Sequence, residues 1–183
     1  VPVHFFVRVD FDGFRHIVNT LGGIDVSVPQ TINDPKYPDE NYGYDPFYIE
    51  VGPQHLDGDM ALKYARTRAT LGADFDRARR QQQVLFAIRE KALAIGAVPK
   101  IPELWATMAD TVQTDLQLVD ILELAKLSDE ISGEDIQSTV IDNNMTVDYR
   151  TNTGAQVLLP VREKIRPVID EMFASSEPTG PPP

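Results

Sequence analysis

Residues 63–83 read KYARTRATLGADFDRARRQQQ. The first eighteen of these positions hold six of the seventeen lysines and arginines, although the whole chain carries a formal net charge of -11. Arginine stays charged at any physiological pH, and its planar guanidinium matches the oxygen atoms of a phosphate group in a two-pronged contact. If this stretch folds around one concave site, the expected ligand is therefore a small, highly charged anion.

The second half of the stretch predicts an amphipathic helix from Arg77 to about Ile95. Following its apolar face backwards leads to Arg77, Arg80 and Gln81, whereas Arg79 is rotated away from that face. We therefore expect the first three side chains to face a site and Arg79 to face solvent. The apolar face itself repeats at the helical spacing, with Val84, Leu85, Ile88, Ala92 and Ile95.

The first half of the stretch ends a short predicted helix over residues 56–65, and Arg66 and Arg68 follow it. In an extended segment, residues two apart share a side, so both guanidinium groups would point into one pocket and Thr67 away from it. Asp74 and Asp76 precede the second helix as its candidate caps. The alternative is a solvated basic loop whose arginines pair with surface carboxylates.

The same residues resemble the signature of the LytR-CpsA-Psr family of cell-wall glycopolymer transferases. The resemblance is specific between residues 1 and 93 and looser to about Phe173. Its motifs occur in matching order, as VDFDGF at 9–14, LGGIDV at 21–26, GPQHLDGDMAL at 52–62, YARTR at 64–68 and DFDRARRQQ at 74–82.

The resemblance implies a phosphotransferase at the extracellular face of the bacterial cell membrane. Such an enzyme takes a glycopolymer of the teichoic acid, capsular polysaccharide or arabinogalactan type from polyprenyl pyrophosphate and attaches it to peptidoglycan. A divalent metal, expected to be magnesium, assists, and pyrophosphatase activity can accompany the transfer. Carried onto this chain, the resemblance implies that the pyrophosphate is bound by Arg66, Arg68, Arg77, Arg80 and Gln81.

The resemblance also makes Asp74 and Arg77 the catalytic residues. Asp74 would either orient an arginine or accept the proton of the acceptor hydroxyl, and the sequence leaves both roles open. The metal ligands stay unassigned. Positioning and charge stabilisation supply most of the catalysis in phosphoryl transfer, which suits a site built from arginines.

Two parts of the family pattern are not found in these residues, namely an upstream acidic segment with a serine-aspartate pair and an N-terminal membrane anchor. We therefore expect residues 1–174 to be the C-terminal portion of the catalytic domain, catalytically incomplete alone, in a membrane-anchored full-length protein. An alternative function is a non-catalytic module that binds phosphorylated cell-wall polymer or lipid carrier through the same arginines. Another is an interaction domain whose arginines only pair with internal carboxylates.

Composition sets the limits of these interpretations. A chain of 183 residues with 42% hydrophobic content is expected to form one domain with its own core. The absence of cysteine excludes disulfides and thiolate metal sites. The acidic balance argues against nucleic acid as a partner, because binding to a phosphate backbone requires a broad basic face.

The pattern of elements predicts an α/β fold with a central mixed sheet and helices on both faces. Strands are expected at 3–9, 24–28, 48–51 and 137–141, and further helices at 12–21, 102–108, 116–127 and 155–173. The proline-rich residues 175–183 are expected to be a disordered tail or a linker. The loop at 33–47 is either a mobile rim of the site or a surface hairpin whose aromatic residues cover the core.

Overall fold

The structure is a computed structural model that describes residues 3–39, 41–96 and 112–173, together with residues 99, 101 and 105. The chain divides into two compact units, residues 1–136 and 137–183, and each is described by itself. Most of the helix expected at 102–108, and the tail expected at 175–183, lie outside the described residues.

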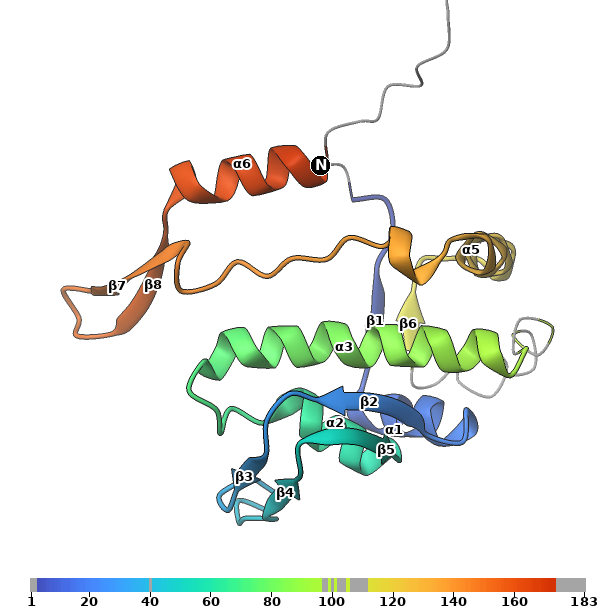
Figure 1. Ribbon diagram of the computed structural model, residues 1–183, viewed down its shortest axis with the longest axis horizontal. Coiled ribbons are helices and arrows are strands. Elements are labelled where there is room, and N and C mark those ends of the chain that lie inside the picture. Colours follow the sequence, from blue (N-terminus) through green and yellow to red (C-terminus); the bar gives the residue numbers. More distant parts are fainter. Residues whose placement is uncertain are drawn as a thin grey trace, which may run out of the picture. The chain divides into compact units, whose positions relative to one another are not determined.

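The described elements include both helices and strands, which confirms the predicted α/β class (Figure 1). The described residues of the second unit form a hairpin and one helix, namely β7 (Thr146–Arg150), β8 (Gln156–Pro160) and α6 (Arg162–Met172). The first unit contains β1 (Val7–Val9), α1 (Phe11–Thr20), β2 (Ile24–Val28), β3 (Ile32–Asp34), β4 (Phe47–Ile49), β5 (Gly52–Leu56), α2 (Gly58–Arg66), α3 (Ala73–Ala94), β6 (Val112–Thr114), α5 (Leu118–Glu130) and the 3-10 helix η2 (Gly133–Asp135).

The described strands pair in four two-stranded antiparallel ladders, and not in the central mixed sheet that the sequence predicted. The ladders are β1 with β6, β2 with β5, β3 with β4 and β7 with β8. The chain runs through β2 and β3, turns, and returns through β4 and β5, so it pairs each strand with an antiparallel partner. A parallel pair would need a long crossover connection, which these segments do not have.

Several predicted boundaries are wrong. The strand expected at 48–51 overlaps only β4 and ends at Ile49, and β5 was not expected because it contains Gly52 and Pro53, which are poor strand formers. Residues 137–141 form no ladder. The helix expected at 155–173 begins only at Arg162, because the chain before it forms the β7–β8 hairpin.

The core of the first unit lies between the β2–β5 ladder, α2 and α3. Ile24, Val26 and Val28 alternate inward along β2, and they pack with Tyr64 of α2 and Val84 of α3. The Gln83 side chain links three elements, since it accepts a hydrogen bond from the Tyr64 hydroxyl at 2.7 Å and donates to the Ser27 carbonyl of β2 at 2.5 Å. This packing fixes the end of α2 and the start of α3, which together carry the arginines.

Helix α3 begins one turn earlier than the sequence predicted. It starts at Ala73, so Asp74 and Asp76 lie in its first turn and do not precede it. Acidic residues are favourable there because of the helix dipole, and the arginines follow in the second turn. The buried face is also rotated from the predicted stripe, since it contains Val84 and Ala87 while Leu85 is 64% exposed.

Candidate functional site

A cavity of about 630 Å³ opens where α2 ends and α3 begins. Its charged lining residues are four cations and one carboxylate, so the cavity is basic in a chain that is acidic overall. The structure brings four of the predicted ligands to it, namely Arg66, Arg68, Arg77 and Gln81. We call this cavity the basic pocket.

Arg66 and Arg68 reach the basic pocket because the chain becomes extended directly after α2. Thr67 caps the helix with φ -56° and ψ 146°, so its neighbours on either side point to a common region. As predicted, the Thr67 side chain takes a different direction from theirs. It is buried, and its hydroxyl donates a hydrogen bond of 2.6 Å to Asp34.

Asp74 lies beside the basic pocket and bridges two of its arginines. Its Oδ1 atom is 2.8 Å from Nε of Arg68 and 2.9 Å from Nη2 of Arg77. Arg68 comes from the loop and Arg77 from α3, so one carboxylate oxygen fixes the spacing of guanidinium groups from two elements. This is the geometry of a group that orients arginines, the first of the two roles that the sequence left open.

Arg80 does not line the basic pocket, contrary to the sequence expectation. It is only 4% exposed and lies beneath the loop that follows α2. Its Nε donates to the Tyr64 carbonyl at 2.9 Å, its Nη2 to the Thr67 carbonyl, and its Nη1 to the Thr70 hydroxyl at 3.3 Å. Burial lowers the pKa of Arg80, and the nearby Asp76 carboxylate acts in the opposite direction. Arg80 therefore holds the loop that presents Arg66 and Arg68.

Arg79 is directed away from the basic pocket, as the helical spacing predicted. Its side chain is half exposed and forms an ion pair of 3.1 Å with Asp76. Asp76 in turn accepts a hydrogen bond of 3.0 Å from the Gly72 amide at the start of α3. Burial acts to raise the pKa of Asp76, but the hydrogen bonds from Thr70 and Gly72 and the charges of Arg79 and Arg80 hold it below the usual value.

The loop at 33–47 contributes to both the core and the basic pocket, so its aromatic residues cover the core as one interpretation expected, and some of its residues line the site. Tyr37 and Phe47 are buried, with ring centroids 6.2 Å apart. Asp34, Lys36 and Tyr37 also line the basic pocket, and the sequence did not identify them as site residues. The signal that could have found them is the β3–β4 hairpin, because Asp34 and Tyr37 contact Thr67 and Arg66 at the end of α2.

Tyr37 and Arg66 form one wall of the basic pocket. Nη1 of Arg66 donates to the Tyr37 hydroxyl at 3.2 Å, and the guanidinium carbon lies 5.7 Å from the centre of the Tyr37 ring. Burial raises the pKa of Tyr37, although the Arg66 charge opposes this. The phenol therefore stays neutral at physiological pH and keeps a proton to donate.

The described residues do not form a magnesium site. No group of three or more acidic, histidine or cysteine side chains converges among them. The two carboxylates at the basic pocket are both engaged, Asp34 with the Thr67 hydroxyl and Asp74 with two arginines. Magnesium is usually held by one or two carboxylates together with water and substrate phosphates, and here both carboxylates are taken up by protein partners. Within the described part of the chain, no helix is long and apolar enough to cross a membrane.

Comparison with known proteins gives a consistent result. The model of the LytR_cpsA_psr family matches residues 1–173. The chain is 32% identical over 142 residues to the polyisoprenyl-teichoic acid–peptidoglycan teichoic acid transferase TagV of Bacillus subtilis. The aligned region covers 77% of this chain and 36% of the relative. It is 29% identical over 167 residues to TagT of the same organism, and this aligned region covers 91% of this chain and 51% of the relative.

The fold is also similar to a solved structure. The crystal structure of B. subtilis TagV matches with a TM-score of 0.70 and 26% sequence identity, and the match covers 95% of this chain and 65% of that one. The chain spans about a third to a half of the length of the curated relatives described above.

Proposed function

Because this chain belongs to the LytR-CpsA-Psr family, we propose that it is part of a phosphotransferase that attaches a polyprenyl-pyrophosphate-linked glycopolymer to peptidoglycan. The observation that supports this most strongly is the convergence of Arg66, Arg68, Arg77 and Gln81 on one cavity. The relatives named as teichoic acid transferases favour a polymer of the teichoic acid type.

The basic pocket suits a pyrophosphate in charge and in geometry. Four cations face it against a single lining carboxylate, Asp34. Arg68 and Arg77 are spaced by their shared ion pairs with Asp74, so their forks are positioned before the ligand arrives. Preorganised donors of this kind stabilise the charge that develops on phosphoryl oxygens during transfer.

The proposed reaction is a displacement at the phosphorus atom that carries the sugar. An oxygen of a peptidoglycan hydroxyl would form the new bond to this phosphorus. The bond from the phosphorus to the bridging oxygen would break, and its electron pair would leave on polyprenyl monophosphate. The hydroxyl proton would pass to water. The arginines and Gln81 would hold the phosphates in line, and Asp74 would hold the arginines.

Three further features are proposed from the family resemblance. The full-length protein would be membrane-anchored and would act at the extracellular face of the cell membrane. Magnesium would assist, but the described residues do not fit it, so its ligands would have to come from the substrate phosphates, water or groups elsewhere.

A second candidate function is the binding of phosphorylated cell-wall polymer or lipid carrier without turnover. It is favoured by one observation, namely that Asp34 and Asp74 already have partners and neither is a free base. Both candidate functions use the same arginines, so ligand binding alone does not separate them.

Turnover separates the two functions. The full-length protein would be assayed with a polyprenyl-pyrophosphate glycopolymer, peptidoglycan and magnesium. We expect transfer by the wild type, a loss of about 10-fold or more in kcat/KM for Arg77→Ala, and little change for Arg79→Ala. Tight substrate binding without any transfer would support the binding module. Equal transfer by the wild type and Arg77→Ala would contradict the proposed site.

A further inference from the structure

A second cavity of about 550 Å³ adjoins the basic pocket and shares Tyr37, Pro38 and Arg66 with it. The guanidinium carbon of Arg66 lies 4.1 Å from the centre of the Phe11 ring, and Phe11 lines only the second cavity. A ligand in the second cavity and a ligand in the basic pocket would therefore contact the same two side chains, Arg66 and Tyr37.

The two cavities differ in charge. The basic pocket has four cations against one carboxylate, whereas the second cavity has three of each. Its carboxylates are Asp39, Asp45 and Asp59. A pyrophosphate is favoured in the first environment and gains no net attraction in the second. The second cavity therefore suits a different class of ligand.

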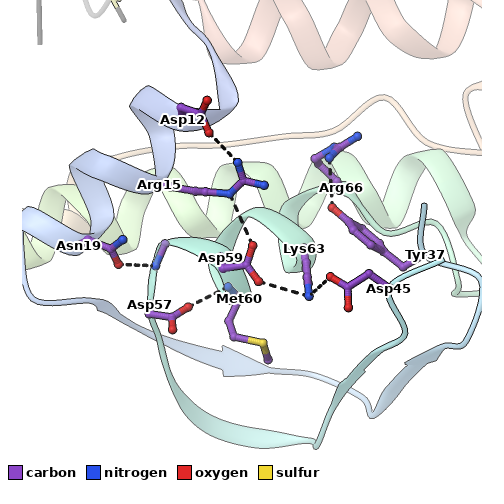
Figure 2. Close-up of polar contacts among 11 residues, drawn as sticks. Asp12, Arg15, Asn19, Tyr37, Asp45, Asp57, Asp59, Met60, Lys63 and Arg66 are labelled. Atoms are coloured by element: carbon purple, nitrogen blue, oxygen red, sulfur yellow. Dashed lines mark hydrogen bonds and ion pairs between the residues drawn. The ribbon is translucent and has the colours of Figure 1, made fainter. Parts of the chain in front are cut away.

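Two of the three cations of the second cavity, Lys63 and Arg15, are paired with carboxylates, and the third, Arg66, donates to the Tyr37 hydroxyl (Figure 2). Lys63 lies 2.5 Å from Asp45 and 3.2 Å from Asp59, and Arg15 lies 3.5 Å from Asp59. Burial acts to lower the pKa of Lys63, but the two carboxylates raise it above the usual value, so it stays charged. Because carboxylates only accept hydrogen bonds and each oxygen can accept more than one, the remaining capacity of the cavity is for a donor-rich ligand.

The second cavity is preformed. The 2.5 Å ion pair joins Asp45 of the β3–β4 loop to Lys63 of α2, whose side chain is only 13% exposed. Asp39 holds the tip of the same loop by accepting hydrogen bonds from the Asn41 amide at 2.8 Å and the Gly43 amide at 2.7 Å. A fixed cavity loses little conformational entropy when it binds its ligand.

We propose that the second cavity binds the acceptor of the transfer reaction as a neutral, polyhydroxylated sugar. This inference rests on the proposed function, since it supplies the hydroxyl that attacks the phosphate held in the basic pocket. The carboxylates accept hydrogen bonds from sugar hydroxyls, and the half-exposed Phe11 ring offers an apolar surface. The shared wall of Arg66 and Tyr37 brings the acceptor hydroxyl beside the pyrophosphate.

The experiment is calorimetric titration of the chain with chitotetraose, a neutral sugar oligomer, with and without saturating inorganic pyrophosphate. Asp45→Asn keeps the shape of the side chain, removes an acceptor from the cavity and leaves Lys63 its second carboxylate. Asp12→Asn is the matched control, because Asp12 pairs with Arg15 at 2.7 Å but is exposed and does not line the cavity.

We expect chitotetraose to bind wild type and Asp12→Asn equally and Asp45→Asn about 10-fold more weakly, with the pyrophosphate Kd unchanged in all three. Absence of sugar binding to the wild type, or equal binding to Asp45→Asn, would overturn the inference. Absence of pyrophosphate binding to the wild type would contradict the proposed function, while the titration without pyrophosphate would still decide the acceptor cavity.

Discussion

Arg77 and Arg80 lie three residues apart on one helix but have different environments. Arg77 faces the basic pocket and is spaced by Asp74, whereas Arg80 is buried and donates to backbone carbonyls. A guanidinium that satisfies buried carbonyls supports the fold of the loop, and one that faces a cavity is available to a ligand. Replacing Arg80 is therefore expected to affect mainly the stability of the fold, and replacing Arg77 mainly the binding of a ligand.

Replacing Arg80 by alanine should destabilise the protein. The Tyr64 and Thr67 carbonyls would lose their donor while buried, so we expect the free energy of unfolding to fall by about 2–5 kcal/mol. Arg79→Ala is the control, because its half-exposed ion pair contributes about 0–1 kcal/mol. Urea denaturation measures both. Equal unfolding free energies for the two variants would show that the Arg80 contacts do not support the fold.

The Asp76 carboxylate gives a pH-dependent contribution to stability. Its pKa is lowered on folding, so its stabilisation is present above the unfolded pKa of about 3.9 and is lost as the pH falls through the folded pKa. We expect Asp76→Asn to lower the free energy of unfolding at pH 7 and the difference from wild type to shrink below about pH 4. A difference that is the same at both pH values would contradict the assigned contacts.

The close crossing of α1 and α2 supports the position of the site. Gly58, the first residue of α2, donates its amide to the Asn19 side chain of α1 at 2.8 Å. A Cβ atom at Gly58 would lie 2.3 Å from the Arg15 carbonyl oxygen, which is too short for any side chain. The two helices can therefore approach this closely only with glycine at that position.

Gly58→Ala should destabilise the protein, although alanine is the better helix former by about 1 kcal/mol. Overpacking against a backbone atom costs about 1–3 kcal/mol or more, so the steric effect should win. Gly133→Ala is the matched control, because nothing lies within 4 Å of the added Cβ. Thermal unfolding compares the variants. A Gly58→Ala protein as stable as wild type would show that the helices do not cross so closely.

Helical periodicity predicted α1, α2 and α5 to within a few residues, because their polar and apolar faces are clearly separated. It misplaced the start of α3, since acidic residues in a first turn look the same in sequence as caps that precede it. It could not separate Arg80 from Arg77, because both lie on the inward face. The path of residues 67–72 decides which arginine contacts backbone carbonyls and which faces a cavity. The spacing of residues along a helix does not predict that path.

The site lies wholly within the first unit of the molecule. The basic pocket and the second cavity are lined by residues between Phe11 and Gln81, while the second unit begins at Gln137. The described strands do not form the central mixed sheet that the sequence predicted. Sequence patterns show which segments can be strands, but the pairing depends on contacts between distant residues, such as β1 with β6.

The chain is acidic overall, yet the basic pocket gathers four cations. A formal net charge of -11 does not favour the binding of anions in general, so selective binding of pyrophosphate must come from the local arrangement of arginines. This selectivity is a local property of the pocket. It requires Arg77 to contribute to binding in a way that its neighbour Arg79 does not.

The selectivity is tested by calorimetric titration of the wild type, Arg77→Ala and Arg79→Ala with inorganic pyrophosphate. Loss of a charge-assisted contact of about 1.5–3 kcal/mol should weaken binding to Arg77→Ala by about 10- to 150-fold. Binding to Arg79→Ala should stay within a few-fold of wild type, because its side chain is directed away from the pocket. Equal affinity of all three proteins for pyrophosphate would contradict the account.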